Sequence, residues 1–139
     1  MSLVLDSSVT LSWCFEDERT PATTKLLERV TEAGAVVPTL WRLEVANALQ
    51  TSVRRGRIDA GFRDASLSDL ALLPIVTDSD TGTYAWSTTL RLAERFGLTV
   101  YDAAYLELAQ RRSLPLATLD EPLRAAGHAL GVPLLGAAA

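Results

Sequence analysis

The stretch Leu3-Val4-Leu5-Asp6-Ser7-Ser8 decides how the fold is interpreted, because a short apolar run stops at a carboxylate and two hydroxyl groups follow. A short apolar run bounded by polar residues is typical of a buried strand. Asp6 then stands where the strand ends and a helix begins. It either caps that helix or points into a crevice that it shares with other carboxylates.

Further along the chain, short apolar runs alternate with longer helical patterns. Runs that read as strands lie at 35–37, 73–76, 98–100 and 114–117. The run at 98–100 is either a strand or only a connector. Helices are expected at 20–33, 40–55, 59–72, 81–96, 102–112 and 121–130. This alternation predicts an α/β fold, a three-layer α/β/α sandwich with a central parallel sheet.

Composition indicates an ordinary globular protein. The 139 residues fit a single domain, and 48% hydrophobic with 22% charged residues excludes a disordered chain. One cysteine, Cys14, allows no internal disulfide, and with one histidine, His128, it cannot build a Cys/His zinc site. The N-terminus does not read as a signal peptide and no run is long enough to span a membrane, so a cytoplasmic protein is expected.

Three aspartates share one local pattern, in which an apolar run is followed by a carboxylate and then a helix. They are Asp6, Asp102 and Asp120. Taken singly, each is explained as a helix N-cap, which is worth about 1 kcal/mol over alanine. In a parallel sheet, however, the functional crevice lies beyond the carboxyl ends of the strands. The pattern therefore also predicts that these side chains lie together.

Glu44 favours the second interpretation. It lies in a helix that is apolar on most sides, so its carboxylate is expected to be partly buried. Buried acids are rare unless they are paired or bind a metal. The alternative is a salt bridge to Arg42 or to a neighbouring helix.

Four converging carboxylates repel one another. Two unit charges about 5 Å apart cost roughly 3 kcal/mol at an effective dielectric constant of about 20. A divalent cation relieves this repulsion, and ligands that are all oxygen suit Mg²⁺ or Mn²⁺. Such a site supports metal-assisted cleavage of phosphodiester bonds. The net charge of −4 does not by itself suggest a nucleic-acid binder.

Four segments, in order, resemble the signature segments of the PIN-domain ribonucleases, and in particular the VapC-type toxins of toxin–antitoxin pairs. They cover much of the chain and read VLDSSVTLSW (4–13), VPTLWRLEVANALQTSVRRGRI (37–58), LTVYDAAYLELA (98–109) and PLATLD (115–120). The resemblance implies one PIN domain over 1–139. It also implies an RNA substrate, a VapB-type antitoxin that blocks the cleft, and a homodimer.

The resemblance further implies that Mg²⁺ or Mn²⁺ is held by an acidic site of Asp6, Glu44, Asp102 and Asp120. Asp6 and Asp102 would hold a first ion. The other two acids would complete its ligand set, hold a second ion, or orient the attacking water, and both one-ion and two-ion arrangements stay open. Hydrogen bonds from Ser8, Asn47 and Thr118 are implied to support the site.

A different class of function, a catalytically inactive PIN-fold module that binds RNA or a protein, remains the alternative. A dehalogenase-type phosphatase is disfavoured because it needs a second aspartate where Ser8 stands. No G-x-x-x-x-G-K-[ST], G-x-G-x-x-G or G-x-S-x-G motif is present.

Several other residues allow two interpretations. The cluster Arg54, Arg55 and Arg57 either grips RNA phosphates or complements a helix C-terminus. Glu107 is expected to be solvated or interfacial, and 16–18 to be a solvated acidic loop. The three tryptophans are expected to be core or dimer contacts rather than base-stacking residues; they are Trp13, Trp41 and Trp86.

Overall fold

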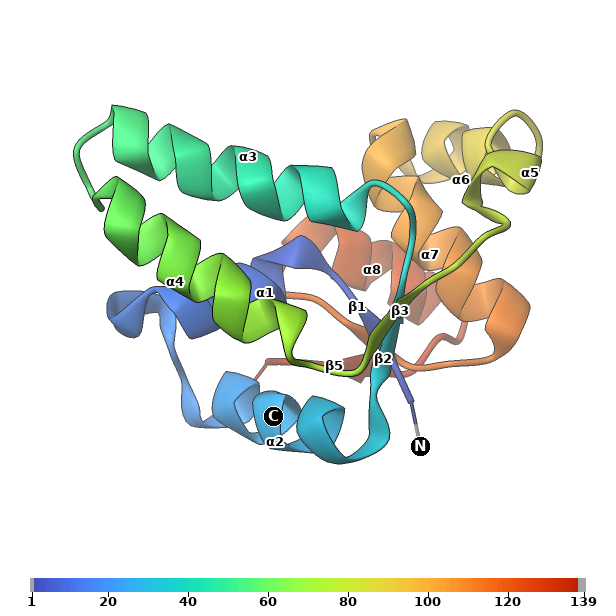
Figure 1. Ribbon diagram of the computed structural model, residues 1–139. Helices are drawn as coiled ribbons and strands as arrows, with labels where there is room; N and C mark the ends of the chain where they lie inside the picture. Colours follow the sequence, from blue (N-terminus) through green and yellow to red (C-terminus); the bar gives the residue numbers. More distant parts are fainter. Residues whose placement is uncertain (1, 138–139) are drawn as a thin grey trace.

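The computed structural model describes residues 2–137 and shows a five-stranded sheet with helices around it (Figure 1). The strand order is β3-β2-β1-β4-β5 and each pairing is parallel. The strands are Val4–Leu5 (β1), Ala35–Val37 (β2), Ile75–Thr77 (β3), Leu116–Ala117 (β4) and Leu134–Leu135 (β5). The expected α/β class with a central parallel sheet is confirmed. Residues 1, 138 and 139 of the expected domain lie outside the described residues.

Helices pack in two groups that flank the sheet. In one group α1 contacts α2 and α3, and α3 contacts α4; in the other α7 contacts both α6 and α8. In Figure 1 the first group runs from blue to green and the second from yellow to red. The helices are Ser7–Cys14 (α1), Pro21–Ala33 (α2), Trp41–Arg54 (α3), Ala60–Ala71 (α4), Thr81–Tyr84 (α5), Thr88–Phe96 (α6), Val100–Arg112 (α7) and Glu121–Ala129 (α8), with a 3₁₀ turn at Glu16–Glu18 (η1).

The core forms where β1 meets α7. Leu3, Val4 and Leu5 are fully buried, as expected for the central strand of a parallel sheet. Helix α7 contacts both β1 and β4, and it is buried without interruption from 103 to 109. A helix buried on so many sides is held in place by packing rather than by one amphipathic face.

The elements differ from the prediction in three details. The run at 98–100 was left open as a strand or a connector, and it is not a strand, because the Thr99 hydroxyl accepts a hydrogen bond from the Asp102 N–H and α7 starts at Val100. The helix expected at 81–96 is two helices, α5 and α6, separated by 85–87. Strand β5 was not predicted at all. Its two residues follow Gly131 and Pro133, which give no alternating pattern.

A buried ion-pair network ties α7 to the end of β3. Arg111 donates to Glu107 at 2.7 Å and to Asp78 at 2.6 Å, and its guanidinium lies 4.6 Å from the centre of the Tyr84 ring. Glu107 is only 3% exposed. The expectation of a solvated or interfacial Glu107 is therefore wrong, because Arg111 one turn later on the same helix neutralises it within the fold.

Arg57 is also paired. It donates to Asp17 and Glu18 of η1 at 2.9 and 3.0 Å, and its guanidinium lies over the Phe15 ring at 4.0 Å. These contacts fasten the turn after α3 to η1. The acidic segment 16–18 is solvent-exposed, as expected, and it forms a 3₁₀ turn in which Asp17 and Glu18 pair with Arg57.

The tryptophans divide into two kinds. Trp13 and Trp41 belong to the core, as predicted, with their indole N–H groups hydrogen-bonded to the Thr23 carbonyl and the Thr10 hydroxyl. Trp86 is 94% exposed. Within residues 2–137, every helix is too short or too polar to cross a membrane.

Candidate functional site

The sheet topology brings the ends of β1 and β4 side by side. Leu5 pairs with Ala117 in register, and the Asp6 N–H donates to the Ala117 carbonyl at 3.0 Å. From β1 the chain passes to β2 on one side of the sheet, and it returns later to β4 on the other side. In open α/β sheets, ligands bind outside the carboxyl ends of the strands at such a reversal of strand order. Asp6 and Thr118 lie at this point, which we call the crevice.

Asp6 stands at the N-cap position of α1, but its carboxylate does not cap the helix. Instead Asp6 Oδ2 accepts hydrogen bonds from the Ser8 and Thr118 hydroxyls, each at 2.7 Å. The residue is 4% exposed. Burial raises the pKa of Asp6, and the two hydroxyl hydrogen bonds oppose this rise without cancelling it. Simple capping therefore does not explain this carboxylate.

Asp120 does act as a cap. Its carboxylate accepts from the Leu123 N–H at 3.0 Å and so begins α8, while its own N–H donates to Thr118 Oγ1 at 3.1 Å. The Thr118 hydroxyl thus joins Asp6 to Asp120. A capping role and a place beside Asp6 are compatible, because the cap holds the Asp120 side chain at the mouth of the same crevice.

Asp102 lies in the first turn of α7, where Thr99 provides the cap. Its carboxylate is half-buried. Burial, followed by the negative charges of Asp120 and Asp6, raises the pKa of Asp102. The sequence placed Asp102 after an apolar run; in the structure it lies in the first turn of α7.

Glu44 lies in the first turn of α3 and is half-buried. Tyr105 of α7 donates its hydroxyl to Glu44 Oε1. Burial raises the pKa of Glu44, the charges of Asp6 and Asp102 add to the rise, and the Tyr105 hydrogen bond opposes it. The alternative of a salt bridge to Arg42 is not realised in the described part of the chain.

Tyr105 escaped prediction from the sequence. It falls among apolar residues of α7 and looks like a core side chain, which it also is. The available signal was its position three residues after Asp102, since residues at that spacing share one face of a helix.

Electrostatic repulsion therefore links the four predicted acids. Each pKa rise at Asp6, Glu44 and Asp102 includes repulsion from at least one other acid of the set. No Arg, Lys or His side chain forms an ion pair with any of the four within residues 2–137. Ser8 and Thr118 lie as expected beside Asp6, whereas the side chain of Asn47 is exposed on α3.

The donor set fits a hard divalent cation, since it is all oxygen and its negative charge has no cationic partner. The side chains are not yet gathered around one point. Over the described residues, no three Asp, Glu, His or Cys side chains are placed to hold a metal ion. Binding an ion requires the carboxylates to move closer together.

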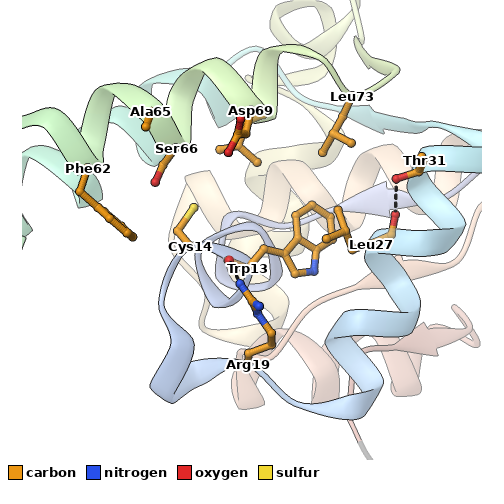
Figure 2. A pocket seen from close by; sticks show the side chains of 11 residues that line it. Trp13, Cys14, Arg19, Leu27, Thr31, Phe62, Ala65, Ser66, Asp69 and Leu73 are labelled. Carbon is orange, nitrogen blue, oxygen red and sulfur yellow. Dashed lines mark hydrogen bonds between the residues drawn. The ribbon is translucent and has the colours of Figure 1, made fainter.

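A separate apolar cavity of about 500 Å³ opens between α1, α2 and α4 (Figure 2). Trp13 and Leu27 form its floor and Phe62 one wall, with Arg19 donating to the Trp13 carbonyl at 2.8 Å. Asp69 lines it, but none of the four crevice acids does. Its lining suits an apolar group rather than a phosphodiester.

Residues 3–129 match the PIN domain family. The chain belongs to this family. The VapC-type assignment drawn from the sequence is confirmed by the relatives of this PIN domain.

One relative, Ribonuclease VapC3 of Pyrobaculum aerophilum, is 29% identical over 133 residues, which cover 96% of this PIN domain and all of the relative. Ribonuclease VapC3 of Mycobacterium tuberculosis is 34% identical over 110 residues, 74% of each protein. The crystal structure of VapBC2 from Rickettsia felis, bound to a DNA fragment from its promoter, aligns with a TM-score of 0.67 at 13% identity. That alignment covers 99% of this chain and all of the other, and it shows a shared fold.

Proposed function

We propose that this PIN domain is a divalent-metal-dependent endoribonuclease that acts as the toxin of a toxin–antitoxin pair. The observation that carries the proposal is the state of Asp6. Asp6 is 4% exposed, and its burial together with the charge of Asp120 disfavours its ionised form. A bound cation would favour the ionised carboxylate.

In this proposal Asp6 and Asp102 hold the first Mg²⁺ or Mn²⁺. Glu44 and Asp120 complete its ligand set, hold a second ion, or orient the attacking water. A bound divalent ion supplies Lewis acidity toward the phosphoryl oxygen and lowers the pKa of water. The chain supplies the carboxylates from four different elements, with Thr118 linking two of them.

RNA as the substrate is supported by the two relatives named Ribonuclease VapC3. Within this chain, no nucleophilic side chain is needed for hydrolysis, because water attacks the phosphorus and the acids position it. The acidic crevice also explains how a protein of net charge −4 engages a polyanion: bound cations offset the local negative charge.

A VapB-type antitoxin that blocks the cleft and a homodimer complete the proposal. The antitoxin is supported by the structural similarity to VapBC2 of Rickettsia felis, which was solved bound to a DNA fragment from its promoter. The sequence resemblance supports the dimer. Co-expression of this chain with the product of a neighbouring small reading frame should give a stable complex in which RNA cleavage is suppressed.

A catalytically inactive PIN-fold module is the second candidate. It is favoured by one observation, namely that no three acids within residues 2–137 are already placed to hold an ion. An inactive module would show no gain in melting temperature with Mn²⁺, whereas a working site is stabilised by mass action.

The decisive experiment is RNA cleavage by the purified protein with Mg²⁺, with Mn²⁺ and with EDTA. We expect cleavage with either ion and none with the chelator. Asp102→Asn should abolish cleavage, while Asp69→Asn, a change in the separate cavity, should leave it intact. Undiminished cleavage in EDTA, or by Asp102→Asn, would refute the proposed function.

A further inference from the structure

The Tyr105 hydroxyl makes polar contacts across the molecule, with Glu44 on α3 and with Ser7 at the start of α1. Its side chain is fully buried in α7, and its hydroxyl donates to Glu44 Oε1 on α3. Buried tyrosine hydroxyls need a partner, and here one partner is a crevice acid. The bond therefore joins two helices that reach the crevice from different parts of the chain.

Glu44 has fewer hydrogen-bond partners for its carboxylate than Asp6 has. Asp6 is held by two hydroxyls and Asp120 by a backbone N–H. Glu44 has a longer side chain, with more torsions to fix, and Tyr105 is its hydrogen-bond donor among the described side chains. Its neighbours in the chain, Leu43 and Val45, offer no polar group.

We propose that Tyr105 is a positioning residue that holds the Glu44 carboxylate toward the crevice through Oε1. Glu44 Oε2 is then left for a cation or for water. This inference rests on the proposed function, because it assigns how one acid of that metal site is oriented. Partners of this kind orient the groups that bind the ion and raise its affinity without touching it.

The test is Mn²⁺ affinity, measured by calorimetry on the full chain. Tyr105→Phe removes only the hydroxyl and keeps the ring in the core. We expect Mn²⁺ to bind about 10- to 100-fold more weakly, the usual effect of losing such a partner. Tyr101→Phe is the matched control, since Tyr101 lies on the same helix and is 65% exposed. It should bind Mn²⁺ as the wild type does.

The same change in a Glu44→Gln background separates positioning from a general structural effect. With the carboxylate gone, Tyr105→Phe should cause no further loss of Mn²⁺ affinity. Melting curves of the variants in EDTA show that each is folded before its Mn²⁺ affinity is compared. An equal loss in both backgrounds, or no loss in either, would overturn the positioning role.

The outcomes also distinguish this inference from the function on which it rests. If the wild type binds Mn²⁺ and cleaves RNA while Tyr105→Phe binds equally well, the positioning role is wrong and the function stands. If the wild type neither binds Mn²⁺ nor cleaves RNA, the proposed function fails, and the role of Tyr105 fails with it.

Discussion

Replacing Asp102 with asparagine is expected to stabilise the metal-free protein while it removes activity. Burial and the charges of Asp120 and Asp6 raise the pKa of Asp102, which means that its ionised form is disfavoured in the folded state. Asparagine keeps the shape and removes the charge. The wild-type residue is therefore retained at a cost in stability, which is a common property of functional sites.

The magnitude follows from two opposing effects. At about 5 Å and an effective dielectric constant of about 20, one carboxylate pair repels by roughly 3 kcal/mol. Asp102 is half-exposed, so water screens this to about 1–2 kcal/mol. Against it, the first turn of α7 loses a favourable negative charge worth about 0.3–1 kcal/mol. The net gain is about 1 kcal/mol, or roughly 4 °C in melting temperature for a domain of this size.

The assay is calorimetric melting at pH 7 in EDTA. Asp59→Asn is the control, because Asp59 caps α4 through the Phe62 N–H and asparagine caps equally well. Its melting temperature should barely change. Adding Mn²⁺ should raise the melting temperature of the wild type but not that of Asp102→Asn. If Asp102→Asn melts below the wild type in EDTA, repulsion among these acids is not what raises the pKa.

Two further predictions concern neighbouring contacts. Burial alone would raise the pKa of Asp78, but the hydrogen bonds and charge of Arg111 hold it below its usual value. The stabilisation from this ion pair is therefore present above about pH 4 and lost as pH falls below it. In urea unfolding, Asp78→Asn should lower the free energy of unfolding by about 3 kcal/mol at pH 7 and by little near pH 2. Equal losses at the two pH values would contradict this. Thr118→Val removes a hydrogen-bond donor to Asp6 and should lower the free energy of unfolding by about 1.5–3 kcal/mol. The control Thr24→Val, at an exposed position, should lower it by less than about 0.5 kcal/mol. Similar losses in the two variants would contradict the prediction.

The sequence allowed the site to be predicted where local pattern and topology agree. Asp6 and the segment ending at Asp120 follow β1 and β4 directly, and adjacent parallel strands must bring their ends together. Glu44 could be predicted because a carboxylate in a mostly apolar helix is expected to be partly buried, and a buried acid needs a partner or a metal ion. Asp102 follows an apolar run that is not a strand, and it is the first turn of α7 that places it where the charges of Asp6 and Asp120 raise its pKa.

Contacts between distant segments could not be predicted from the sequence. Tyr105 looks like a core residue because its ring is one, and its partner Glu44 lies on another helix. Glu107 was misread because helical geometry points it away from Asp102, while its pairing with Arg111 one turn later was overlooked. The additional pairing of Arg111 with Asp78 depends on tertiary packing, which no local pattern encodes.

Anomalous scattering from crystals grown with Mn²⁺ tests the central claim most directly. The account predicts an anomalous peak in the crevice, within about 2.0–2.4 Å of carboxylate oxygens that include those of Asp6 and Asp102, and no such peak in Asp102→Asn crystals. Mn²⁺ bound elsewhere with the crevice empty, or an unchanged peak in the variant, would contradict it.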